Sequence, residues 1–208
     1  MGLASYKHSL TSLNFRICKL TEWNPEETFN RIVRADLTGV AFLESTEFER
    51  FSMYKFSIDY PPVCSIQFDP KGKRTVGDML FLFPGKEKIY LTWGELEKAK
   101  MKFPNASDQA IHSIGVMKKI RTIKRLETIS EDLLTINSHQ AAYRQIRLEE
   151  MAGGILPNGR TILHEGYSIH LHCDQSSRYF AIYTIVSSKS PEDFGELFRL
   201  MVNSFRCH

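Results

Sequence analysis

The chain has 208 residues, of which 42% are hydrophobic and 25% charged, a composition typical of a soluble globular protein. Its net charge of +3 is too small to indicate a nucleic-acid partner, and no run of about 18 apolar residues predicts a membrane span. The first residues lack the apolar core of a signal peptide, so we expect a cytoplasmic protein that binds no membrane. The length fits a single domain over residues 1–208.

The cysteines are widely separated in the sequence and form no C-x-x-C pair; they are Cys18, Cys64, Cys173 and Cys207. This spacing predicts neither a structural zinc site nor a dense disulfide framework. We therefore expect free thiols and no cofactor. Cys173 lies in an apolar segment and is expected to be buried as a small hydrophobic residue.

Residues 1–48 predict an extension made of a strand and a helix, next to a core that spans residues 49–208. Asn24 and Pro25 have the chemistry of a helix cap and a first turn. Trp23 and Phe29 are the aromatic anchors of this extension. We expect them either to pack the extension onto the core or to bind a protein partner or a second copy of the chain.

Alternation of polar and apolar residues predicts antiparallel strands in the next part of the chain. In residues 50–59 the even positions are mostly apolar, which predicts one strand that ends before Pro61. Further strands are expected at residues 66–68, 78–84 and 88–93. The last two are expected to pair around Pro84 and Gly85.

Two helices and several long strands are expected in residues 94–186. The first helix covers residues 94–102, and the second begins at Ser107 and Asp108. The buried stripe of the second helix is expected to consist of Ile111, Ile114, Met117 and Ile120. Strands are expected at residues 121–136, as two short strands, and at 140–148, 160–173 and 178–186.

The last helix is the most clearly predicted element. Ser190 can cap it, Pro191 suits its first turn, and two acidic residues follow. Apolar residues at steps of three and four form one stripe, which consists of Phe194, Leu197, Phe198, Met201 and Phe205. Each would contribute roughly 2 kcal/mol when fully buried, so the helix needs a large apolar partner such as a sheet. Together these elements predict an α+β fold.

Three stretches of the chain occur in a recognisable order. The first is YKFSIDYP at residues 54–61, the second is INSHQA at residues 136–141, and the third is residues 179–184 with the closing helix that ends in Ser204 and Phe205. In these stretches, and in the order of elements from about residue 50 to the end, the chain resembles the PsbP/Mog-like superfamily. That group includes a photosystem extrinsic subunit, a Ran-GTPase-binding protein and bacterial DcrB-type lipoproteins.

The resemblance implies an antiparallel sheet flanked by helices, an αβα sandwich, to which the N-terminal strand-helix extension is added. The family has no shared catalytic residues, and its members are mostly binding or assembly factors. The resemblance therefore favours a role that is not enzymatic. The sequence agrees, because it contains no G-x-S-x-G, P-loop, G-x-G-x-x-G or H-E-x-x-H motif.

Two clusters are candidate binding sites. His170 and His172 share one face of a predicted strand, with His164 upstream, and they could supply metal ligands or be helix-covered histidines in hydrogen bonds. The concentrated basic patch consists of Lys118, Lys119, Arg121, Lys124 and Arg125. It could bind phosphates, but it lacks the interleaved aromatic residues that stack on bases.

We thus expect a cytoplasmic protein that binds or assembles with another protein and has no catalytic residues. A homodimer is compatible with this role. A nucleic-acid or anion binder that uses the basic patch is the first alternative. A small metal-binding protein that uses the paired histidines is the second.

Overall fold

The computed structural model describes residues 48–152, 160–187 and 191–208. The strands are β1 (Glu49–Met53), β2 (Phe56–Tyr60), β3 (Ser65–Phe68), β4 (Gly77–Leu82), β5 (Lys88–Glu95), β6 (Ile123–Ile136), β7 (His139–Ala152), β8 (Arg160–Cys173) and β9 (Arg178–Ser187). The helices are α2 (Leu96–Lys100), α3 (Ala106–Lys118) and α4 (Pro191–Ser204). Within this part of the chain no helix is long and apolar enough to cross a membrane. Apart from Phe48, the predicted extension, with Trp23 and Phe29, lies outside the described residues.

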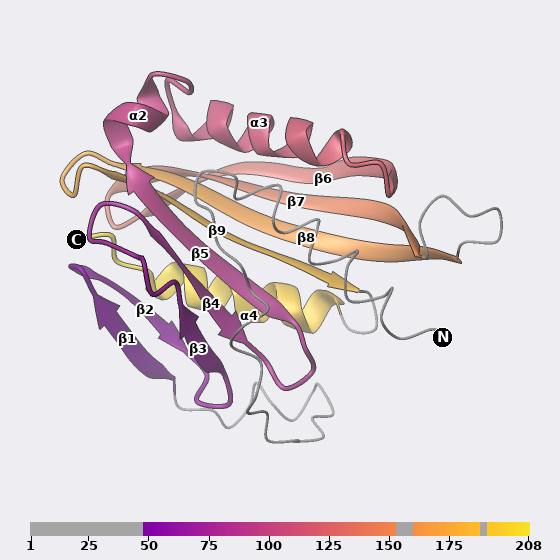
Figure 1. The fold of residues 1–208 in the computed structure, drawn as a ribbon, viewed down its shortest axis with the longest axis horizontal. Helices are drawn as coiled ribbons and strands as arrows, with labels where there is room; N and C mark the ends of the chain where they lie inside the picture. The colour runs from indigo at the N-terminus through magenta and orange to yellow at the C-terminus, as the bar shows by residue number, and fades with distance from the viewer. Residues whose placement is uncertain (1–47, 153–159, 188–190) are drawn as a thin grey trace.

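The main sheet has seven strands in the order β3-β4-β5-β9-β8-β7-β6, and every neighbouring pair is antiparallel. A separate two-stranded sheet contains β1 and β2. Helices lie between and after the strands, and Figure 1 shows α3 and α4 on opposite sides of the main sheet. The predicted α+β class with an antiparallel sheet is confirmed.

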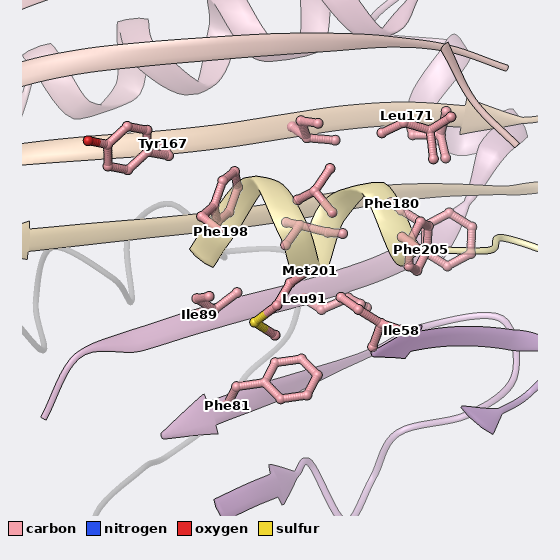
Figure 2. Close-up of a cluster of buried hydrophobic side chains, with 14 of the residues drawn as sticks. Ile58, Phe81, Ile89, Leu91, Tyr167, Leu171, Phe180, Phe198, Met201 and Phe205 are labelled. Atoms are coloured by element: carbon pink, nitrogen blue, oxygen red, sulfur yellow. The ribbon is translucent and has the colours of Figure 1, made fainter. Parts of the chain in front are cut away.

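The main core lies on the side of the sheet that α4 covers. Odd-numbered residues of β8 point to this side, and Figure 2 shows Tyr167 and Leu171 of β8 near α4. Phe198 and Met201 of α4 are fully buried there, as is Phe205 just after the helix. The predicted stripe of the last helix is therefore confirmed, with Phe194 only partly buried at its start.

The opposite side of the sheet has a smaller core under α3. Ile114 and Met117 of α3 pack with Ile146 and Leu148 of β7. The predicted stripe is wrong at Ile111, whose side chain is 56% exposed. An α-helix turns by about 300° over three residues, which is about 60° short of a full turn. A stripe made only of steps of three therefore drifts around the helix, and its first residue, Ile111, points away from the core.

Asn105, not Ser107, caps α3, because its side chain accepts a hydrogen bond from the backbone of Asp108 at 2.9 Å. Polar and small residues complete the buried side of this helix; they are Ala106, Gln109 and Ala110. The buried side of α3 is therefore partly polar, and Gln109 can form a hydrogen bond with a histidine of β8.

Two predicted strand boundaries are wrong. Residues 50–59 form a hairpin instead of one strand, because Tyr54 and Lys55 adopt left-handed backbone conformations with φ of 51° and 63°. Residues 121–136 form one long strand, β6, instead of two short ones. The register of β6 with β7 shifts between Ile123 and Arg125 and again between Thr128 and Ser130, and such bulges interrupt the alternation from which strands are predicted.

Candidate metal centre

One end of the sheet brings a histidine and a cysteine together across two strands. His139 begins β7 directly after the turn at Asn137 and Ser138, whose φ angles are 48° and 68°. Cys173 ends β8. The β7–β8 register pairs Ala141 with Leu171, and continuing it by two residues places His139 opposite Cys173 on the side that α4 covers.

The C-terminal segment after α4 supplies two more side chains at the same place. Ser57 of β2 and Arg206 exchange two backbone hydrogen bonds, of 2.9 and 2.8 Å. This bridge directs Cys207 and His208 to the end of the sheet. Figure 1 shows the C-terminus beside the turn that joins β8 to β9.

The four side chains lie close enough together to hold one metal ion. One ligand atom each from His139, Cys173, Cys207 and His208 lies within 4.8 Å of all the others. The Sγ of Cys173 is 3.5 Å from Nε2 of His139 and 3.5 Å from Nδ1 of His208, and Sγ of Cys207 is 3.4 Å from the same Nδ1. A tetrahedral zinc ion with ordinary bond lengths requires sulfur–nitrogen separations of about 3.6 Å.

Other polar groups orient these side chains. Asn137 Nδ2 lies 3.2 Å from the ring nitrogens of His208 and 3.6 Å from Sγ of Cys207. The backbone N–H of Ser176 donates to Sγ of Cys173 at 3.4 Å. The buried guanidinium of Arg178 interacts electrostatically with both cysteines and would partly balance the charge of two thiolates.

Burial governs the protonation of the cluster without a metal. It raises the pKa of Cys207 to about 12, with a further contribution from a hydrogen bond with Cys173. Burial, followed by the neighbouring His208, lowers the pKa of His139 and favours its neutral imidazole. Neutral imidazole is the form that ligates metals, and zinc deprotonates the thiols it binds, so metal binding here would release protons.

The histidines that the sequence singled out lie on the opposite side of β8, under α3. His172 Nε2 is 2.8 Å from Oε1 of Gln109 on α3, and His164 Nε2 is 3.3 Å from Oε2 of Glu150. His170 is buried, and burial lowers its pKa to about 3. These contacts are those of helix-covered histidines, and a metal site at His170 and His172 stays a prediction.

The basic patch is exposed where α3 ends and β6 begins. Its members Lys118, Lys119, Arg121, Lys124 and Arg125 are on or next to these two elements. The guanidinium of Arg125 forms an ion pair with Glu127. Anion or nucleic-acid binding by this patch stays a prediction.

Sequence reasoning missed the metal cluster because its members are far apart. The ligand candidates come from two strand ends and the C-terminal segment. Cys173 follows His139 by 34 positions, and Cys207 follows Cys173 by 34 positions. No local spacing pattern of structural zinc sites contains such intervals. The available signal was indirect. Cys207 and His208 are adjacent, HLHC ends one predicted strand, and NSH directly precedes another.

Comparison of the sequence with models of protein families finds no match. Comparison with curated protein sequences also finds none. Among solved structures, the chain is similar to cyanobacterial PsbP (CyanoP) from Synechocystis sp. PCC 6803, with 11% identity and a TM-score of 0.56. This similarity covers 80% of the chain and 95% of CyanoP. It confirms a PsbP-like fold, and at this identity it concerns the fold alone.

Two further structures are more weakly similar. A protein from Bacteroides thetaiotaomicron has 13% identity and a TM-score of 0.44, over 74% of this chain and 45% of that protein. The putative regulator PA94 from Pseudomonas aeruginosa, of unknown function, has 6% identity and a TM-score of 0.44, over 77% of this chain and 97% of that protein. Neither bears on the function.

Proposed function

We propose that this chain binds one zinc ion through His139, Cys173, Cys207 and His208 and that the ion has a structural role. The observation that carries the proposal is the mutual approach of the four ligand atoms to within 4.8 Å. Two thiolates and two imidazoles in a tetrahedral arrangement are a donor set that favours zinc. Magnesium and calcium prefer oxygen ligands and would not suit this cluster.

The proposed site is closed, which argues against catalysis. Four protein ligands fill a tetrahedral shell and leave no position for water or a substrate. Cys173 and Cys207 are both fully buried, so neither is placed to attack a substrate. The ion would instead connect the start of β7 and the end of β8 to the segment that follows α4. We propose that the surrounding architecture is an αβα sandwich.

Metal analysis of the purified full chain tests this proposal. Mass spectrometry of the metal content should find one equivalent of zinc, retained after dialysis. His139→Ala and Cys207→Ser should each lose the zinc, because three remaining ligands leave a weak, open site. The control is His112→Ala. His112 is exposed on α3, contacts the ring of Phe103, and is not one of the four cluster residues. A wild-type chain without zinc, or equal zinc in all variants, would contradict the proposal.

A second candidate function is protein binding or assembly, and the outer edge of β6 favours it. Among the described strands, β6 is the terminal strand of the main sheet on this side, so its outer backbone groups have no strand partner there. Ile129 and Leu133 of β6 are 44% and 64% exposed. A protein segment or a second copy of the chain could add a strand at this edge.

A shallow hollow beside this edge would add specificity. Its volume is about 350 Å³, and Asp132, Leu134, Tyr143, Arg199 and Asn203 line it. The guanidinium of Arg199 lies 5.6 Å from the centre of the Tyr143 ring. A partner segment on β6 could thus find both apolar and charged contacts.

A pull-down from native lysate separates this function from the alternatives. Leu133→Lys places a charge on the proposed edge and should reduce capture of the partner, whereas Ile111→Lys, on the exposed side of α3, should not. Equal capture by both variants would contradict the edge as the binding surface. Salt-dependent binding of DNA or RNA that falls on replacing Lys118 and Lys119 would favour the nucleic-acid alternative instead.

A zinc-thiolate site suits a reducing compartment, which supports a cytoplasmic location.

A further inference from the structure

We propose that the Cys₂His₂ cluster is a redox-sensitive zinc site, in which a hydroperoxide oxidises Cys173 and Cys207 to a disulfide and thereby expels the ion. This inference rests on the proposed zinc binding and adds its regulation. It follows from the placement of two thiols next to each other, from the exposure of one histidine ligand, and from the backbone that carries each cysteine.

The two sulfurs are neighbours although they come from different parts of the fold. Both belong to the group of atoms within 4.8 Å of one another, and the two cysteine side chains share a hydrogen bond. Cys173 is held at the end of β8, within the seven-stranded sheet. Cys207 is in the short segment after α4, where a single isolated bridge at Arg206 pairs the backbone with β2. A small movement of this segment would bring the sulfurs to bonding distance.

The site borders solvent on the side of its histidines. His208 is exposed and His139 is partly exposed, whereas both cysteines are fully buried. A small oxidant such as hydrogen peroxide would approach the sulfurs from this side of the cluster. Cys64 differs, because it is buried in the main core and does not belong to the four-residue cluster.

The chemistry balances with the peroxide as the two-electron oxidant. The thiolate sulfur of one cysteine attacks a peroxide oxygen, the O–O bond breaks, and hydroxide leaves, which gives a sulfenic acid. The second thiolate attacks that sulfur, the S–S bond forms, and a second hydroxide leaves. Two thiolates and one hydrogen peroxide thus give one disulfide and two hydroxide ions. A disulfide is a poor zinc ligand, so two of the four ligands are lost and the ion dissociates.

The two states would both attach the C-terminal segment to β8. Zinc does so in the reduced state through Cys173 and Cys207, and the disulfide does so in the oxidised state through the same residues. The fold is therefore expected to survive oxidation. What changes is the availability of zinc and of the imidazoles of His139 and His208, which the ion no longer holds.

Stepwise oxidation of the zinc-loaded full chain tests this inference. The chain is loaded with zinc, treated with increasing hydrogen peroxide, and followed with a chromophoric zinc chelator. We expect about one zinc released for each peroxide consumed, a mass decrease of about 2 Da, and a peptide that links Cys173 to Cys207. Cys64 should still be available for alkylation after unfolding, and dithiothreitol should restore zinc binding.

The outcomes distinguish failure of this redox inference from failure of the proposed zinc binding. A chain that takes up no zinc during loading contradicts the zinc site itself. A chain that takes up zinc but keeps it after peroxide treatment overturns only the redox inference. So does release of zinc with oxygen added to the cysteines and no Cys173–Cys207 disulfide. Cys18→Ser and Cys64→Ser should each behave as wild type, which would show that the response belongs to the cluster.

Discussion

The Nη2 atom of Arg178 donates a hydrogen bond to the carbonyl oxygen of Cys207 at 3.4 Å. The Nη1 atom of the same guanidinium donates to the carbonyl of Arg74 at 3.3 Å. The guanidinium also lies 5.0 Å from the centre of the Phe180 ring and 5.6 Å from that of Phe56. One buried side chain therefore connects the loop before β4, the aromatic core and the C-terminal segment.

Replacing this side chain should destabilise the protein even without metal. Arg178→Met keeps much of the volume but leaves the buried carbonyl oxygen of Cys207 and the partly buried one of Arg74 with fewer partners, so we expect a loss of about 2–4 kcal/mol in the free energy of unfolding. Arg178→Lys should lose less, because the charge remains without the forked geometry. Urea unfolding in the presence of a chelator measures this, and wild-type stability of Arg178→Met would disprove the structural role.

Two glycines offer a matched test of packing. A Cβ atom on Gly77 of β4 would lie 2.5 Å from Cζ2 of Trp93, whose indole is fully buried and donates to the carbonyl of Lys73. Gly77→Ala should therefore cost about 1–3 kcal/mol of stability. In α3, a Cβ on Gly115 meets nothing within 4 Å. Gly115→Ala should raise stability by about 0.5–1 kcal/mol.

Thermal unfolding of the two variants side by side gives the comparison. The midpoint should fall for Gly77→Ala and rise for Gly115→Ala. A shift in the same direction for both would mean that the close approach at Trp93 is not a real constraint on β4.

Much of the fold was predictable because burial repeats with the period of each element. The stripe of α4 has steps of three and four, and β8 alternates apolar and polar residues from Tyr167 to Cys173, so both were predicted with correct bounds or nearly so. The hairpin of β1 and β2 was missed because Tyr54 and Lys55 occupy left-handed positions where glycine or asparagine is usual. In β6, bulges break the period.

The candidate site was less predictable for a different physical reason. A metal cluster is defined by distances between atoms, and sequence patterns report distances only within one element. His170 and His172 were noticed because they are two apart in one strand, yet they face α3. The register of β7 with β8 and the bridge at Arg206 create the actual cluster, and both depend on the folded sheet.

The buried imidazole of His170 predicts a loss of stability in acid. Burial, followed by the charges of Arg144 and His172, lowers the pKa of His170 from 6.5 to about 3. The unfolded chain therefore binds this proton more readily than the folded protein between these values. Stability contributed by this difference is complete above pH about 6.5 and decreases as the pH falls, by about 1.4 kcal/mol per pH unit.

Comparison with a variant isolates the effect of this group. Between pH 7 and 5 the wild type should lose about 2 kcal/mol through His170, and His170→Leu should lose correspondingly less. Urea unfolding at both pH values, with chelator present, provides the measurement. An identical pH dependence in the two proteins would show that His170 protonates equally in the folded and unfolded chain.

Asn137 is expected to tune the affinity of the proposed zinc site. Its Nδ2 lies within 3.2 Å of the His208 ring and 3.6 Å of Sγ of Cys207, so it can orient one ligand and donate to another. Asn137→Gly removes these contacts while permitting the left-handed φ of 48° at this turn position. Zinc affinity, measured by competition with a chelator, should fall about 10- to 100-fold.

Ser138→Gly is the matched control for this prediction. Ser138 is the next residue of the same turn and also has a positive φ, of 68°, so glycine relieves the backbone equally in both variants. No ligand contact of Ser138 is part of the cluster among the described residues. Its zinc affinity should therefore match that of the wild type. Equal zinc affinities in the wild type and both variants would mean that Asn137 only shapes the turn. A loss of affinity in both variants would mean that turn flexibility, not ligand orientation, sets the affinity.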